Sequence, residues 1–216
     1  MNTLIISGGN IEVDLALEVL KTKYEHIIAV DGGLKFCYEQ DIVPTRIVGD
    51  FDTLEPEILE WYKSHTQIEV REYNPVKDAT DTQIAVELAL ELGSGRITIL
   101  GGTGTRLDHV LGNIETLYLA LEKGVDCQIL DSYNRIRLIR GTHVIKKSEQ
   151  YGKYVSLIPF TTDVDGVTLD GMKYPLYKHH FTVLGSGGFG VSNEIVAEEA
   201  RISVDNGIFI CIESKD

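Results

Sequence analysis

The chain has 216 residues, of which 43% are hydrophobic and 25% charged, a balance typical of one large or two small globular domains. Its 33 acidic and 20 basic side chains give a net charge of −13, which disfavours binding to nucleic acid or to anionic membrane surfaces. Three widely spaced cysteines lack zinc-site spacing, and no apolar run has the length of a membrane span. Because the N-terminus does not resemble a signal peptide either, we expect a cytoplasmic protein with neither nucleic-acid nor membrane partners.

About the first 130 residues repeat an apolar segment that ends in Gly or Asp and is followed by an amphipathic segment. The apolar segments cover residues 3–9, 26–33, 46–52, 96–104 and 127–132. Strands that alternate with helices predict a mostly parallel sheet covered on both faces, which is a Rossmann-like α/β/α domain. Ligands of such sheets bind beyond the carboxyl ends of the strands, where this chain carries its glycines and aspartates.

The segment RIVGDFDTLEPE, residues 46–57, has two carboxylates one residue apart, Asp50 and Asp52, directly after an apolar pair. If the strand continues through them, both side chains point to one face, where each opposes ionisation of the other. Taken alone, such a pair is typical of a strand end whose carboxylates cap the following helix.

Two further acidic clusters follow along the chain. Asp78 and Asp81 flank Thr80, whose spacing to Gln83 is that of a capping box and predicts a helix beginning at Thr80. A carboxylate at a helix start complements the helix dipole, which explains one of these aspartates better than two.

The segment LGGTGTRLDHVLGN predicts a strand, a glycine-rich turn at 101–104 and a helix with Asp108 near its start. Backbone N–H groups of such a turn and a helix N-terminus favour a phosphate, and Arg106 adds a bidentate donor. No G-K-[ST] follows, so the turn is not a Walker A loop. An apolar stripe is expected on one side of the helix at Leu107, Leu111, Ile114, Leu117 and Leu121.

Clustered carboxylates need a cation, and aspartate oxygens without a histidine or cysteine set favour Mg²⁺ shared with substrate phosphates. The sequence therefore predicts that Asp50 and Asp52 hold a metal ion that neutralises a polyphosphate. The alternative is a haloacid-dehalogenase-like phosphatase, since VGDFDTL also resembles the D-x-D-x-[TV] signature, in which Asp50 would be the nucleophile.

After about residue 134, helical periodicity largely disappears and short strands separated by turns are expected, which predicts a small antiparallel β domain. Asp205-Asn206-Gly207 separates two alternating apolar runs and predicts a hairpin between them.

Seven motifs resemble, in order, the thiamine pyrophosphokinase family over nearly the whole chain. They are DGG (31–33), GDFDT (49–53), KDATDTQIA (77–85), GGTGTRLDHVLGNI (101–114), SLIP (156–159), GVTLDGMKYPL (166–176) and GVSNE (190–194). The resemblance implies a catalytic domain at 1–133, a thiamine-binding β-sandwich at 134–216, and transfer of a diphosphoryl group from ATP to thiamine. It also implies a homodimer whose active sites are shared between subunits.

By position, the resemblance implies catalytic roles for Asp50, Asp52, Asp81 and Asp108, and Mg²⁺ ligation by Asp50, Asp52, Asp78 and Asp108. ATP or its phosphates would contact Asp31, Gly32, Thr80, Gly102, Thr103, Gly104 and Arg106. Thiamine would contact Lys77, Asp81, Ser192 and Asn193. A further alternative is a thiamine or nucleotide sensor without catalysis, although every acidic position expected of the enzyme is present.

Overall fold

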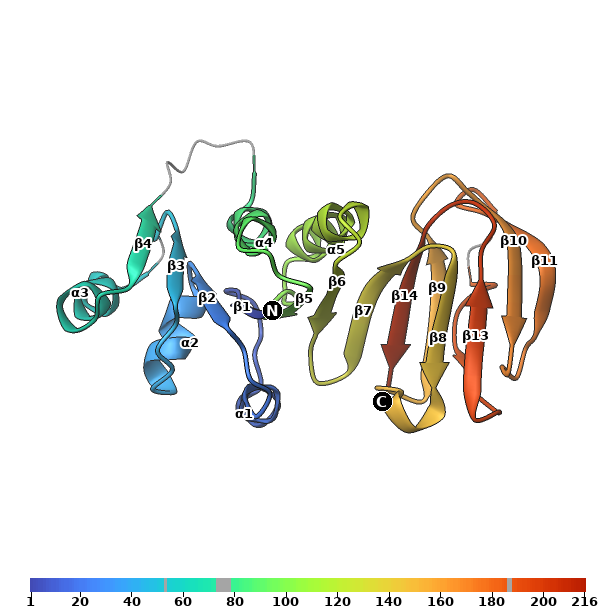
Figure 1. The fold of residues 1–216 in the computed structure, drawn as a ribbon, viewed down its shortest axis with the longest axis horizontal. Helices are drawn as coiled ribbons and strands as arrows, with labels where there is room; N and C mark the ends of the chain where they lie inside the picture. The colour runs from blue at the N-terminus through green and yellow to red at the C-terminus, as the bar shows by residue number, and fades with distance from the viewer. Residues whose placement is uncertain (53, 73–78, 186–187) are drawn as a thin grey trace. The chain divides into compact units, whose positions relative to one another are not determined.

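A computed structural model describes residues 1–52, 54–72, 79–185 and 188–216 (Figure 1). The chain divides into two compact units, residues 1–132 and 133–216, which we call the first and second units. Within the described residues, no helix is long and apolar enough to cross a membrane.

The first unit is built on a parallel sheet. Its strands are β1 (Asn2–Ile6), β2 (His26–Val30), β3 (Arg46–Gly49), β4 (Glu69–Glu72), β5 (Arg96–Leu100) and β6 (Asp126–Leu130). They lie in the order β4-β3-β2-β1-β5-β6, and each neighbouring pair is parallel. Successive strands proceed in one direction from β1 to β4 and in the other from β5 to β6, so the topological switch point lies between β1 and β5.

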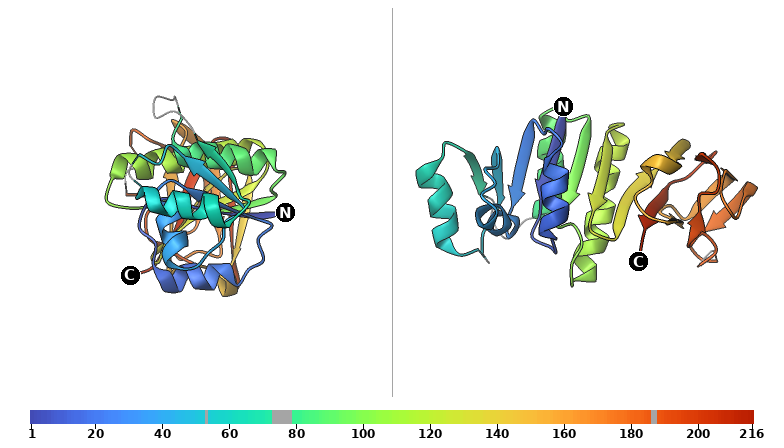
Figure 2. Two further views of the ribbon diagram at one scale, coloured as in Figure 1. Left: turned by 90° about the vertical axis from the view of Figure 1, so that its left-hand side faces the viewer. Right: turned by 90° about the horizontal axis from the view of Figure 1, so that it is seen from below.

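Helices cover both faces of this sheet, as predicted (Figures 1 and 2). They are α1 (Val13–Leu20), α2 (Gly33–Glu39), α3 (Pro56–His65), α4 (Asp81–Glu91) and α5 (Leu107–Glu122). Helices α1 to α3 lie on one face and α4 and α5 on the other. Because both faces are covered, the central strands are continuous apolar runs: Ile5, Ile28 and Ile99, for example, are fully buried.

The helix signals in the sequence are confirmed at α4 and α5, although the apolar stripe of α5 is only partly buried. Thr80 caps α4, and its Oγ1 accepts a hydrogen bond from the Gln83 backbone N–H at 3.2 Å. Ile114 and Leu117 of the stripe are buried, whereas Leu107 and Leu111 are 73% and 61% exposed. The first two turns of α5 therefore expose their apolar side chains.

The second unit is an antiparallel sandwich. One sheet has the order β12-β9-β14-β7, from β7 (Asn134–Ile139), β9 (Tyr154–Pro159), β12 (Asn193–Glu194) and β14 (Phe209–Ser214). The other has the order β11-β10-β13-β8, from β8 (Thr142–Lys146), β10 (Asp163–Asp170), β11 (Leu176–Thr182) and β13 (Glu199–Ser203). A short 3₁₀ helix, η1 (Lys147–Glu149), follows β8.

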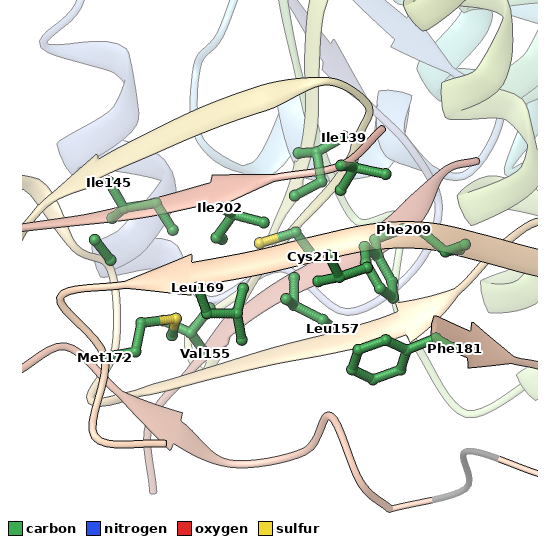
Figure 3. Packing of buried hydrophobic residues seen from close by; sticks show 14 of the residues in the cluster. Ile139, Ile145, Val155, Leu157, Leu169, Met172, Phe181, Ile202, Phe209 and Cys211 are labelled. Atoms are coloured by element: carbon green, nitrogen blue, oxygen red, sulfur yellow. The ribbon is translucent and has the colours of Figure 1, made fainter. Parts of the chain in front are cut away.

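Side chains of both sheets form one core, including Leu157, Leu169, Ile202, Phe209 and Cys211 (Figure 3). The prediction of a β-sandwich is confirmed.

The hairpin predicted at Asp205-Asn206-Gly207 is wrong. In the described part of the chain, β13 pairs with β8 and β10, whereas β14 pairs with β7 and β9. The turn joins the two sheets and is held to β10, since the Asp205 N–H donates to the Asp165 carbonyl at 3.0 Å. The alternating apolar residues on either side of it reflect two sheets facing one core, a pattern that a hairpin shares.

Candidate active site

Two glycine turns meet at the switch point of the parallel sheet. The turn after β1 donates to the turn after β5 through Gly9 N–H to Gly101 O at 2.9 Å and Asn10 N–H to Thr103 O at 2.8 Å. A Cβ atom at Gly9 would lie 2.2 Å from the Thr103 carbonyl oxygen, so only glycine permits this contact between the two backbones.

A pocket of about 650 Å³ opens at this edge of the first unit. Ten residues predicted from the sequence line this pocket: Asp31, Gly32, Asp50, Thr80, Asp81, Gly102, Thr103, Gly104, Arg106 and Asp108. The convergence of strand ends and helix starts is the arrangement expected of ligand sites in open parallel sheets.

Three carboxylates form the centre of the acidic cluster. Asp31, Asp50 and Asp52 each offer an oxygen within 4.8 Å of the others. Asp31, which sequence reasoning assigned to ATP, lies at the end of β2, and the other two follow the neighbouring strand β3. Within the described residues, Asp31 Oδ1 is buried and has no hydrogen-bond partner.

The route by which Asp50 and Asp52 converge differs from the predicted one. Strand β3 ends at Gly49, so the two carboxylates are not on one face of a continuing strand. Phe51 between them has φ of 57°, in the left-handed region that non-glycine residues seldom adopt. The backbone turns back here, and the Asp52 N–H lies 3.4 Å from Asp50 Oδ1. A strained turn, rather than strand alternation, therefore gathers the pair.

The electrostatics of the cluster favour a cation. Burial raises the pKa of Asp31, and the charges of Asp81, Asp50 and Asp52 raise it further. A divalent ion would relieve this repulsion and give the buried Asp31 Oδ1 a partner. The donor set consists of carboxylate oxygens, which suits a hard ion such as Mg²⁺, so the residues fit the predicted metal.

Asp108 and Arg106 pair with each other on the exposed rim of the pocket. Arg106 donates from Nε to Asp108 Oδ1 at 3.2 Å and from a terminal nitrogen to Oδ2 at 2.6 Å. The guanidinium lowers the pKa of Asp108 to about 2. In the described part of the chain, Asp108 is not a member of the three-carboxylate cluster, so the metal and phosphate roles predicted for this pair require the ion pair to open.

Of the predicted thiamine contacts, Asp81 lines the pocket and the others lie on other segments. Lys77, and Asp78 that was predicted as a metal ligand, lie outside the described residues. Ser192 is exposed, with a left-handed φ of 61°. Asn193 is 8% exposed, and its amide is used inside the second unit: Oδ1 accepts from Tyr174 N–H at 3.0 Å and Glu194 N–H at 2.9 Å, and Nδ2 donates to Tyr174 O at 2.9 Å. Any contact of Asn193 with a ligand has to share these bonds.

Sequence reasoning missed several residues that build the pocket. Ser7, Gly8, Gly9 and Asn10 line it, and Asn113 supports it by donating from Nδ2 to the Gly102 carbonyl at 2.8 Å. The Thr103 hydroxyl donates to Asp131 at 2.9 Å and ties the glycine turn to the end of β6. The segment ISGGN after β1 carried the same strand-then-glycine signal as the segments that were recognised.

Both parts of the chain are similar to known proteins. Residues 17–129 match the family described as thiamin pyrophosphokinase, catalytic domain, and residues 142–209 match thiamin pyrophosphokinase, vitamin B1 binding domain. The curated thiamine pyrophosphokinase of Bacillus subtilis is 36% identical over 98% of both chains.

Solved structures are also similar over the full length. The crystal structure of thiamine pyrophosphokinase from Bacillus subtilis has a TM-score of 0.87 at 33% identity and covers 100% of each chain. That of Geobacillus thermodenitrificans has a TM-score of 0.85 at 30% identity and covers 100% of this chain and 98% of its own. With both parts of the sequence matched and the acidic pocket lying within the first, the chain belongs to the thiamin pyrophosphokinase family.

Proposed function

We propose that this protein transfers a diphosphoryl group from ATP to the hydroxyl of thiamine, giving thiamine diphosphate and AMP. The observation that carries the proposal is that the three carboxylates lie at the ligand-binding edge of the part of the chain that matches the family's catalytic domain. Thiamine carries a permanent positive charge, which suits an acidic pocket and a chain with a net charge of −13.

The chain's own residues supply positioning and charge. Asp50 and Asp52, joined by Asp31, would hold Mg²⁺, which when bound offsets the charge of the polyphosphate. Arg106 exchanges its bond to Asp108 for a phosphate oxygen, and the glycine turn at 101–104 lets the nucleotide approach the backbone. Diphosphoryl transfer needs little covalent help, because alignment of the thiamine hydroxyl with the β-phosphorus, opposite the departing AMP oxygen, is the main requirement.

A carboxylate accepts the proton of the thiamine hydroxyl. The sequence offers two candidates for this acceptor, Asp81 and Asp108. Asp81 lies in the first turn of α4, where its charge acts on the carboxylate cluster through Asp31, whereas Asp108 lies on the exposed rim of the pocket. We therefore favour Asp81 as the acceptor.

Phosphorus-31 NMR of the reaction mixture tests the proposal. AMP and thiamine diphosphate should form together, only when thiamine, ATP and Mg²⁺ are all present. Thiamine monophosphate with ADP would instead show a simple kinase. A covalent aspartyl-phosphate at Asp50 would show the phosphatase, and binding of both ligands without turnover would show the sensor.

We also infer a cytoplasmic homodimer with active sites shared between subunits. Three free, buried cysteines support a reducing compartment, and the family resemblance supports the dimer. Mixing an Asp50→Asn variant with a separate Ser192→Arg variant, whose added positive charge would repel thiamine, tests the shared site. After reassociation of equal amounts, half the dimers are mixed and each has one intact site, so about one quarter of wild-type activity should return. If subunit exchange is demonstrated and no activity returns, each site lies within one chain.

A further inference from the structure

Two pairs of hydroxyl groups connect helix α4 and the residues just after it to strand β1 and the residue just after it, one pair near each end of the helix. At the N-terminal end, Ser7 Oγ and Thr82 Oγ1 lie 2.7 Å apart. At the C-terminal end, Thr3 Oγ1 and Ser94 Oγ lie 2.5 Å apart. All four side chains are buried, the most exposed being Ser7 at 7%. Each pair is thus one serine and one threonine: Thr82 of α4 bonds Ser7 just after β1, and Thr3 of β1 bonds Ser94 just after α4.

Neither pair is needed simply to attach the helix. The buried face of α4 is formed by Ala85, Val86, Leu88 and Ala89, which pack α4 on the sheet. Apolar packing is non-directional and tolerates small shifts of a helix along its axis. A hydrogen bond contributes only about 1 kcal/mol net, but it requires a short distance and a favourable angle. A hydroxyl pair therefore limits where the end of the helix can lie.

Only one of the two pairs lies at the pocket. Ser7 and Thr82 line it, and Thr82 follows directly after Thr80 and Asp81. Thr3 and Ser94 are at the opposite end of the helix, which at 11 residues is about 16 Å long. The two ends thus provide an internal comparison between a bond beside the pocket and an equivalent bond away from it.

Ser7 is itself held in place. Its N–H donates to the Leu100 carbonyl at 2.9 Å, and a Cβ atom at Gly101 would lie 2.2 Å from the Ser7 carbonyl oxygen. Its backbone is thus fixed against the glycine turn, while its side chain contacts α4. A shift of the glycine turn or of the helix start would break the Ser7–Thr82 bond.

We propose that Ser7 and Thr82 are positioning residues, which set the N-terminus of α4 and the Asp81 carboxylate relative to the glycine turn that receives the nucleotide. The inference rests on the proposed function, because the position of Asp81 matters where thiamine must align with ATP. Misplacement by about 1 Å far from the reacting atoms costs up to about a hundredfold in rate.

Two matched double variants test the proposal. Ser7→Ala with Thr82→Val removes the pair at the pocket, and Ser94→Ala with Thr3→Val removes the pair at the other end. Each double variant loses one serine and one threonine hydroxyl and keeps nearly the same volume, so both should lower the unfolding midpoint similarly. The first should lower kcat about tenfold or more, with KM for Mg-ATP within about twofold of wild type, whereas the second should keep kcat within about twofold. Thr82→Ser, which retains the hydroxyl, should recover most of the kcat lost in Thr82→Val.

An equal kcat in the two double variants, with wild type active, would overturn the proposal. Amide hydrogen exchange gives a second test that needs no activity. Loss of the Ser7–Thr82 pair should speed exchange at Gln83 and Ile84 in the first turn of α4, and loss of the other pair should speed it at Leu92 and Ser94. Unchanged exchange at Gln83 and Ile84 would also contradict the inference. If wild type forms no thiamine diphosphate, the proposed function fails and the exchange result still decides the positioning role.

Discussion

Each unit of this protein contains a carboxylate withdrawn from solvent, and the two differ in whether their oxygens have hydrogen-bond and charge partners. Glu213 in the second unit is 1% exposed and fully bonded: Arg135 donates from Nε at 2.7 Å and from a terminal nitrogen at 2.5 Å, and the Tyr151 N–H donates at 2.9 Å. Asp31 in the first unit is partly buried beside other carboxylates, and within the described residues its Oδ1 lacks a partner. A satisfied buried carboxylate supports a fold, whereas an unsatisfied one in an acidic cluster indicates a ligand.

The largest effect is expected from neutralising the acidic cluster. Asp50→Asn and Asp52→Asn should each lower the rate of thiamine diphosphate formation at least about a hundredfold, since loss of an outer partner of a metal ligand already costs about 10–100-fold. Neither change should lower the free energy of unfolding, because each relieves repulsion between carboxylates. Turnover and urea unfolding measure the two quantities.

Asp163→Asn, on an exposed carboxylate of the second unit, is the matched control and should leave turnover unchanged. Near-normal turnover in Asp50→Asn or Asp52→Asn would reduce that residue to a structural role and remove the contrast with Glu213.

The opposite response is expected at the satisfied carboxylate. Arg135→Met leaves Glu213 buried without its cation, which should cost about 3–5 kcal/mol of unfolding free energy. Adding Glu213→Gln removes the uncompensated charge and should recover part of the loss. Lys146→Met, which breaks the exposed Lys146–Glu149 pair, should leave the urea midpoint unchanged. A stable Arg135→Met variant would show that the second unit tolerates unpaired carboxylates as well.

Local signals predicted much of this structure. Strand-then-glycine segments and the Thr80 cap depend on residues close in sequence, so the parallel sheet and the start of α4 could be predicted. The Asp31 cluster and the Ser7–Thr82 pair depend on contacts between distant segments, which one sequence does not display. The turn at 205–207 was misassigned because the local signal for a reversal does not specify whether the chain stays in one sheet.

A smaller effect should distinguish folding from binding in the GVSNE motif. Asn193→Ala leaves the part-buried Tyr174 and Glu194 N–H groups without their acceptor, which should cost about 1–3 kcal/mol in all. Ser192→Gly removes the strain of a left-handed φ and should not destabilise. Urea unfolding and KM for thiamine should therefore separate the two residues. If Asn193→Ala raises KM for thiamine without loss of stability, its amide serves thiamine rather than the fold.

The smallest effect concerns protons and Mg²⁺ at Asp31. Its pKa in the folded protein is raised above the usual 3.8, so the native state binds more protons than the unfolded state between the two values. Stability without metal should therefore fall as pH rises through that window, and Asp31→Asn should lack this fall.

Mg²⁺ requires the ionised carboxylate, so it should stabilise least at acidic pH and most above the raised pKa. At ten times its Kd it should add about 1.4 kcal/mol, or raise Tm by about 3–6 °C. Thermal unfolding with Mg²⁺ or with chelator, over a pH series from the usual pKa of 3.8 to pH 8, measures this difference. Equal stabilisation across the whole series, or in Asp31→Asn, would mean that Mg²⁺ does not use the Asp31 carboxylate from which the comparison with Glu213 began.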